Sequence, residues 1–361
     1  MSRTLLDLNK IPDSVAQVEL GLKRRVVGQT RAINALTSAV ASVLSGMASP
    51  HRPAGVFLFM GPTGSGKTRS VESLAETCFG SQTALIKINC AEYSSGHEVA
   101  KLVGAPPGYL GHKDTIALLS EESIRKYRTK DYPFTILLFD EIEKANNQLW
   151  NLLLGVLDKG EICLGDNKTI DLTDCIIIMT SNLGAREMAS LGEDGIGFAK
   201  KPEHSNKSES DIDQKLYTVG VAAAKKRFSP EFINRIDKLI VFRSLTTEVL
   251  GQILDIELRK VQHRIITNEH PNFPKFSISF TPAAKKFLLE EGLDPKYGAR
   301  HLRRAVDKFV LHNIRNIVGT RQVESGDRVV FDRKISDKHL VAYKLPQIDI
   351  KEFAISAQTV V

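Results

Sequence analysis

Short runs of nearly continuous apolar residues alternate with helical patterns over the first 240 or so residues. The runs cover residues 55–60, 84–89, 134–139, 175–180 and 238–242. Apolar runs without polar alternation are typical of strands that are buried on both faces of a parallel sheet. Helical periodicity follows the first and third runs, over residues 68–78 and 149–157. This alternation predicts an α/β fold in which helices flank a parallel five-stranded sheet.

The pattern changes after about Leu245. Three segments have helical periodicity there, namely residues 248–264, 282–290 and 300–317, and residues 276–280 and 328–331 have the pattern of short strands. We therefore expect a second, smaller and mostly helical domain.

Two polar segments do not resemble packed elements. Residues 184–215 are rich in Gly, Lys, Glu and Ser, and the residues from about Pro346 onward form the end of the chain. A long polar segment such as residues 184–215 inside a compact domain is usually either functional or mobile. The chain contains no internal repeat, so we expect one module rather than two.

Composition and charge exclude few classes of protein. The 361 residues are 42% hydrophobic and 25% charged, as is typical of a soluble globular protein. The net charge of +7 is spread along the chain, which permits contact with nucleic acid without arguing for it. No leader is apparent and no apolar stretch approaches the roughly 18 residues of a membrane helix, so we expect a cytoplasmic protein.

The cysteines predict neither a zinc site nor a disulfide framework. The chain has four, Cys78, Cys90, Cys163 and Cys175, which are far apart and lack both a CxxC pair and an accompanying histidine cluster. We expect all four to be reduced and buried.

A phosphate-binding loop follows the first apolar run. Gly61-Pro62-Thr63-Gly64-Ser65-Gly66-Lys67-Thr68 matches the pattern GxxxxGK[ST] between a predicted strand and a predicted helix. The glycines let backbone N–H groups turn toward phosphate oxygens, and the helix N-terminus adds a positive dipole end. Lys67 is then expected at the β- and γ-phosphates of ATP, and the Thr68 hydroxyl at Mg²⁺.

Two other strands end in polar residues that suit the same chemistry. Asp140 and Glu141 end the third run, as in a Walker B strand, so we expect Asp140 beside the metal and Glu141 to deprotonate the attacking water. Asn182 follows the fourth run. Because ligands of open α/β sheets bind at the carboxyl edge, these residues are expected to meet the phosphate loop there.

Seven ordered motifs resemble the second ATPase module of the Clp-family AAA+ unfoldases ClpB, ClpA and ClpC. They lie at residues 26–29 (Val-Val-Gly-Gln), 61–68, 104–111 (Gly-Ala-Pro-Pro-Gly-Tyr-Leu-Gly), 140–144 (Asp-Glu-Ile-Glu-Lys), 179–182 (Met-Thr-Ser-Asn), 230–237 (Pro-Glu-Phe-Ile-Asn-Arg-Ile-Asp) and 297–300 (Tyr-Gly-Ala-Arg). The match covers residues 20–335 or so. We therefore expect a stand-alone, single-module member of this family.

The resemblance implies a ring, a hexamer by analogy, with ATP between neighbouring subunits. It places Val26 and Val27 beside the adenine and makes Asn182 a sensor that helps to place the water. Arg235 would be the arginine finger that reaches the γ-phosphate of the next subunit, and Arg300 a second sensor in the helical domain. Without the motifs, both arginines would be read as partners of nearby acids such as Asp237 and Asp294.

The resemblance also assigns two loops. Tyr109, between glycines, would line the axial pore and grip an unfolded or aggregated polypeptide, although a turn whose tyrosine packs back on its own domain fits as well. Ile196, Gly197 and Phe198 lie where protease-coupled members dock on a ClpP-like peptidase, although these side chains could equally fold back onto the sheet. Ser229 departs from the family pattern, which commonly has an arginine there.

These features predict four regions and leave alternative functions open. The regions are an N-terminal segment (1–25), a large ATPase domain (26–244), a small helical Clp-type domain (245–340) and a tail (341–361). The leading function is an ATP-driven unfoldase or remodelling chaperone that threads polypeptide through its pore. The alternatives are a regulatory subunit that feeds a ClpP-like peptidase and a nucleic-acid motor of the same superfamily, and the sequence favours neither a membrane nor a nucleic-acid partner.

Overall fold

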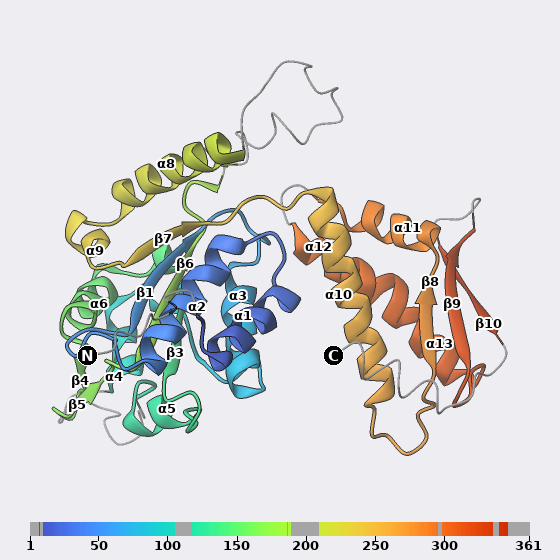
Figure 1. The fold of residues 1–361 in the computed structure, drawn as a ribbon, viewed down its shortest axis with the longest axis horizontal. Coiled ribbons are helices and arrows are strands. Elements are labelled where there is room, and N and C mark those ends of the chain that lie inside the picture. Colours follow the sequence, from blue (N-terminus) through green and yellow to red (C-terminus); the bar gives the residue numbers. More distant parts are fainter. Residues whose placement is uncertain are drawn as a thin grey trace, which may run out of the picture. The chain divides into compact units, whose positions relative to one another are not determined.

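The chain divides into two compact units, Met1–Ser244 and Leu245–Val361. The computed structural model describes residues 7, 10–104, 117–185, 187–188, 209–294, 298–334 and 339–345. The two units are described separately below, with the element labels of Figure 1.

The first unit alternates strands and helices. Its helices are α1 (Asp13–Arg25), α2 (Thr30–Leu44), α3 (Lys67–Phe79), α4 (Ala100–Val103), α5 (Glu121–Arg125), α6 (Asn147–Lys159), α8 (Glu209–Arg227) and α9 (Pro230–Asn234), with short 3₁₀ turns at Cys90–Tyr93, Gly96–Val99 and Ile142–Lys144. Its strands are β1 (Gly55–Met60), β2 (Ile86–Asn89), β3 (Thr135–Asp140), β4 (Glu161–Cys163), β5 (Thr169–Asp171), β6 (Cys175–Ser181) and β7 (Lys238–Val241).

Five of these strands form the predicted parallel sheet, in the order β2-β3-β6-β1-β7. The predicted fold class is therefore confirmed, and each apolar run matches its strand within two residues. The remaining strands, β4 and β5, form a separate antiparallel hairpin.

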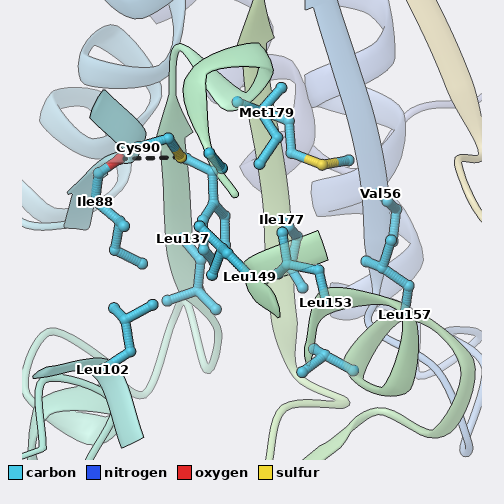
Figure 2. Packing of buried hydrophobic residues seen from close by; sticks show 14 of the residues in the cluster. Val56, Ile88, Cys90, Leu102, Leu137, Leu149, Leu153, Leu157, Ile177 and Met179 are labelled. Atoms are coloured by element: carbon cyan, nitrogen blue, oxygen red, sulfur yellow. Dashed lines mark hydrogen bonds between the residues drawn. The ribbon is translucent and has the colours of Figure 1, made fainter. Parts of the chain in front are cut away.

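Helices cover both faces of the sheet, which is why its strands are apolar throughout (Figure 1). Alternate residues of β1 face opposite ways: Val56 and Leu58 pack on the α6 side, and Phe57 and Phe59 pack on the side of α1, α2 and α3. Figure 2 shows side chains of α6, such as Leu149 and Leu153, packed over those of the central strands.

Local capping starts the two helices that matter most for the site. Asn146 accepts a hydrogen bond from the backbone N–H of Leu149 at 3.0 Å, which begins α6. Ser229 accepts one from the backbone N–H of Phe232 at 3.2 Å, which begins α9 together with Pro230 in the first turn. The serine that departs from the family pattern therefore serves as a helix cap.

The second unit packs helices around one core and a small sheet. Its elements are α10 (Thr247–Ile266), β8 (Ser277–Phe280), α11 (Pro282–Gly292), α12 (Ala299–Val306), a π-helical turn (Asp307–Leu311), α13 (His312–Gly319), β9 (Arg328–Arg333) and β10 (Leu340–Leu345). The sheet order is β10-β9-β8, with β9 parallel to β8 and antiparallel to β10. Leu254, Phe287 and Phe331 are among its fully buried residues.

The structure differs from the predicted elements in several places. The helices α1 and α2 and the β4–β5 hairpin were not predicted. Residues 341–345, which we assigned to the tail, belong to β10 and pair with β9. The segment at residues 184–215 includes the start of α8, at Glu209. Among the described residues, no helix is long and apolar enough to cross a membrane.

The expectation that all cysteines are buried is wrong for one of them. Cys78, Cys90 and Cys175 are buried free thiols, whereas Cys163 is exposed at the end of β4 in the two-stranded hairpin. Burial raises the pKa of the Cys78 and Cys175 thiols to about 12, and it raises the pKa of Cys90 as well.

We therefore expect a single fast-reacting thiol in the folded protein. At pH 8 a disulfide reagent such as DTNB should modify Cys163 quickly, because the other thiols are inaccessible and stay protonated below their raised pKa values. The other three should react only after unfolding in guanidinium. Cys163→Ser is the control, and a fast phase that survives in this variant would contradict the assignment.

Candidate nucleotide site

The phosphate loop joins β1 to α3 at the carboxyl edge of the sheet. β1 ends at Met60 and α3 begins at Lys67, as the motif predicted. Gly61 has φ 143°, and a Cβ there would lie 2.7 Å from the backbone oxygen of Phe242. Gly66 has φ 102° and caps α3, so both positions require glycine.

Lys67 is buried inside this loop. Its Nζ donates hydrogen bonds to the backbone oxygens of Gly61 (2.7 Å) and Pro62 (2.9 Å) and to Asn182 Oδ1 (2.9 Å). The lysine and the residue that we predicted as a sensor are therefore in direct contact, although they are 115 positions apart in sequence. This contact holds the ammonium group next to the loop, where a triphosphate would need it.

The loop has features of a cradle for an anion. The Ser65 hydroxyl is buried and has no hydrogen-bond partner among the described residues, and a Cβ on Gly66 would meet no atom within 4 Å. A positive helix N-terminus and the Lys67 ammonium group face the same loop. The residues present therefore fit a bound phosphate group.

The carboxylate of Asp140 is the centre of a small polar cluster. Its Oδ1 accepts hydrogen bonds from the Thr68 hydroxyl (3.1 Å) and from the Thr180 hydroxyl (2.5 Å), and its Oδ2 lies 3.4 Å from Lys87 Nζ. Hydroxyl and carboxylate oxygens are the ligands that Mg²⁺ prefers. Thr180 and Lys87 were not predicted as site residues. The position of Thr180 near the carboxyl end of β6 was a signal that could have identified it, whereas Lys87 lies within β2 and carries no such signal.

Glu141 has a strained backbone and a fixed side chain. Its φ of 59° is left-handed, which is uncommon for a residue other than glycine. Its backbone N–H donates to the Thr180 hydroxyl at 3.1 Å, so Thr180 bridges the two acidic residues. Its carboxylate pairs with Lys144 Nζ at 2.6 Å and lies 3.5 Å from Asn182 Nδ2.

Lys144 neutralises the predicted general base. The hydrogen bond and the charge of Glu141 raise the pKa of this lysine above its usual value, so it stays protonated at neutral pH. Lys144 is half-exposed, so a ligand can displace this pair. In the described structure, then, the carboxylate of Glu141 is held by a cation rather than free to accept a proton.

A second acid holds Asn182, the residue that we predicted as a sensor. Glu143 Oε1 accepts a hydrogen bond from the backbone N–H of Asn182 at 3.0 Å. Asn182 therefore contacts Lys67, Glu141 and Glu143 at once. The polar residues at the ends of β3 and β6 meet the phosphate loop, as predicted from the carboxyl edge of a parallel sheet.

Gln29 holds the phosphate loop from the other side. The side chain is buried, and its Nε2 donates to the backbone oxygens of Ser65 and Arg243, each at 3.1 Å. Its Oε1 accepts from the backbone N–H of Arg243 at 3.3 Å. The sequence marked Gln29 only as part of a motif, because a bridge over 214 positions has no local signature.

Arg235 lies at the opposite edge of the sheet. It follows α9 and precedes the amino end of β7, where Asp237 binds the backbone N–H of Val56 at the start of β1. β1 separates this edge from the phosphate loop, and its six residues span roughly 17–20 Å. Within this chain, Arg235 is therefore about one strand length away from the phosphate loop.

Two side chains hold Arg235 in place. Arg52 Nη2 donates a hydrogen bond to the backbone oxygen of Arg235 at 2.7 Å. The Nε of Arg235 lies 3.1 Å from Asp158 Oδ1. The partner that we considered from sequence, Asp237, instead lies 3.5 Å from Arg52.

Val26, Val27 and Arg300 are the other predicted site residues that the structure describes. Val26 is buried in the apolar core beside α1, and Val27 is half-buried. Arg300 is exposed near the start of α12 in the second unit. Tyr109, Ile196, Gly197 and Phe198 lie outside the described residues.

Family models match most of the chain. Residues 52–239 match the AAA domain (Cdc48 subfamily), and residues 245–331 match the C-terminal D2-small domain of ClpB protein. These two matches meet at the boundary between the compact units.

Curated relatives and solved structures agree with these models. The chain is 38% identical over 320 residues to the ATP-dependent Clp protease ATP-binding subunit ClpC of Staphylococcus epidermidis, which covers 89% of this chain and 37% of the relative. The Staphylococcus aureus ClpC is 37% identical over 333 residues, covering 91% of this chain and 38% of the relative. The chain thus spans little more than a third of these relatives.

The fold is similar to that of Hsp104. A closed-state cryo-EM structure of Hsp104 with ATPγS and FITC-casein has a TM-score of 0.75 and 31% identity, covering 92% of this chain and 52% of that one. The S. cerevisiae Hsp104–casein complex in an extended conformation gives the same TM-score and identity over 93% and 53%. The chain belongs to the Clp/Hsp104-type AAA+ ATPases, with an AAA domain followed by a D2-small domain.

Proposed function

We propose that this chain hydrolyses ATP at the subunit interfaces of a hexameric ring and uses the cycle to thread polypeptide through an axial pore, as an unfoldase or remodelling chaperone. The observation that carries the proposal is the position of Arg235, a sheet length away from Lys67 and Glu141. A site that lacks an arginine finger of its own is completed when a neighbouring subunit supplies one.

The described residues divide the chemistry between them. Lys67 and the backbone of the phosphate loop bind the β- and γ-phosphates, and Asn182 orients the attacking water. Thr68 and Asp140 would hold Mg²⁺, which would screen the phosphate charges when bound. Glu141 removes a proton from the water once Lys144 releases its carboxylate, and Arg235 of the adjoining subunit stabilises the charge that develops on the γ-phosphate.

Further parts of the proposal rest on the family resemblance. Val26 and Val27 would flank the adenine, and Arg300 would report the nucleotide state to the small domain. Tyr109 would grip the polypeptide in the pore. We also retain the four proposed regions and a cytoplasmic location, with the tail shortened by the residues of β10.

Relatives support the choice of substrate. The two Hsp104 structures contain casein, which is a protein substrate rather than a nucleic acid. A regulatory subunit that feeds a ClpP-like peptidase is the second candidate, because the ClpC relatives are named as ATP-binding subunits of the Clp protease. Docking of residues 196–198 on a peptidase would distinguish this second candidate from an independent unfoldase. Co-purification of the chain with a peptidase ring tests the docking directly.

Replacement of the general base should separate binding from hydrolysis. We expect Glu141→Gln to bind ATP with wild-type affinity and to hydrolyse it at least about 100-fold more slowly, because the amide cannot accept a proton. A fluorescent nucleotide measures the binding, and phosphate release measures the rate. Normal hydrolysis by this variant would remove Glu141 from its role.

The arginine finger should make the rate depend on assembly. ATP hydrolysis per subunit should rise with protein concentration as rings form, and Arg235→Ala should lose about 10³-fold or more of the assembled rate. Arg315→Ala, which replaces an exposed arginine of α13, is the matched control. Monomers that hydrolyse ATP at a rate insensitive to Arg235 would contradict the proposal.

Thr180 should matter through the metal site. Thr180→Val keeps the shape of the side chain and removes the hydroxyl that bridges Asp140 and Glu141. We expect a higher Mg²⁺ concentration for half-maximal hydrolysis and a maximal rate that is about 10-fold lower, whereas Thr180→Ser should stay close to wild type. A Mg²⁺ titration at saturating ATP provides the measurement.

A further inference from the structure

Arg227, the last residue of α8, binds the turn that follows Glu141. Its guanidinium donates two hydrogen bonds to the backbone oxygen of Glu143, from Nη2 at 2.7 Å and from Nε at 3.1 Å. This turn, Ile142–Lys144, connects the general base to α6. An arginine can make both bonds at once because its donors form a rigid planar fork.

Trp150 binds the same turn from α6. Its indole Nε1 donates to the backbone oxygen of Ile142 at 3.1 Å. The guanidinium of Arg227 lies over the ring of Trp150, 4.4 Å from its centroid. Two successive carbonyl groups of the turn are therefore held by two side chains that also hold each other.

On one side this turn contacts the nucleotide site. Glu143 Oε1 accepts the backbone N–H of Asn182, and Asn182 contacts Lys67. The other carboxylate oxygen of Glu143, Oε2, is buried and has no hydrogen-bond partner among the described residues. Because an unpartnered buried carboxylate oxygen is costly, other contacts must hold Glu143 in this position, and the two hydrogen bonds from Arg227 to its backbone oxygen are among them.

On the other side an aromatic stack leads to the arginine finger. Phe228, next to Arg227, packs edge-on against Trp150, with ring centroids 5.4 Å apart. On its other side it stacks on Phe232, with centroids 5.3 Å apart. Phe232 is buried in α9, and Arg235 is the C-cap of that helix. Arg227, which clamps the turn, and Arg235, the finger, are thus only eight positions apart in the sequence.

We propose that Arg227 and Trp150 are positioning residues that couple the ATP site of a subunit to the arginine finger that the same subunit offers to its neighbour. A change at Asn182 moves Glu143, and Arg227 with the aromatic stack transmits the movement to α9. The inference rests on the proposed function, since it requires Arg235 to act in the adjoining site. It adds a defined route within the subunit.

The test uses rings assembled from two kinds of full-length subunit. Glu141→Gln subunits cannot hydrolyse ATP but still offer Arg235, and Arg235→Ala subunits keep an intact hydrolytic site but offer no finger. In mixed rings, hydrolysis comes from Arg235→Ala sites that lie next to a Glu141→Gln subunit. Arg227→Met is then introduced only into the Glu141→Gln subunit, which performs no chemistry.

We expect this addition to lower the rate of the mixed rings by about tenfold or more, since a small misplacement of a catalytic group is costly. Lys226→Met in the same subunit is the matched control: it removes a neighbouring charge from the last turn of α8 and should leave the rate unchanged. Binding of a fluorescent nucleotide to the Arg227→Met subunit should stay within about twofold of its parent, because Arg227 does not contact the phosphate loop.

Each other outcome has a separate meaning. Mixed rings that are inactive before Arg227 is changed would overturn the proposed trans-acting finger. Active mixed rings whose rate is the same with Arg227→Met and Lys226→Met would overturn the coupling route alone. If Arg227→Met subunits fail to assemble, Trp150→Phe decides, because it keeps the aromatic ring and removes only the indole donor to Ile142, and an unchanged rate there would also overturn the coupling.

Discussion

The parallel pairing of β1, β6 and β3 is the constraint on which the site depends. Because neighbouring strands run in one direction, their carboxyl ends bring the phosphate loop, Asn182 and Asp140 to one edge. The Thr180 hydroxyl then joins the carboxylate of Asp140, the last residue of β3, to the backbone N–H of Glu141. Apolar burial on both faces of the sheet stabilises the fold. The polar side chains of the cluster therefore need hydrogen-bond partners, but they do not have to hold the fold together.

The same pairing places the amino ends of the strands at the other edge. Arg235 lies there with its backbone bound by Arg52 and its side chain beside Asp158. The parallel sheet therefore places the phosphate loop and Arg235 at opposite ends of its strands. Under the proposed function, completion of a site by a second copy would follow from this geometry and would require no flexible arm reaching around the domain.

Much of the site could be predicted because its signals are local. The phosphate loop, the acids at 140 and 141 and the strands themselves are each encoded within a few consecutive residues. Gln29 and Lys87 could not be predicted, because their contacts depend on which distant backbone and side-chain atoms the fold brings near. The ion pair of Lys144 with Glu141 spans only three positions. It forms next to a left-handed backbone at Glu141, and a glutamate in the sequence does not predict that conformation.

The contacts of Arg227 and Trp150 with the turn at Glu143 also could not be predicted from local sequence. Trp150 and Phe228 look like ordinary core residues in the sequence, and Arg227 looks like one of three basic residues at the end of a helix, where they favour the helix dipole. The contacts of Arg227 and Phe228 with Trp150 form only because the fold brings the end of α8 to α6, more than 75 positions away in the sequence. Among the contacts of the described residues, Arg227 is the cation of that last turn that contacts both a ring and a backbone carbonyl. The proposed positioning role of Arg227 thus depends both on its place on the helix and on the forked guanidinium that its neighbours Lys225 and Lys226 lack.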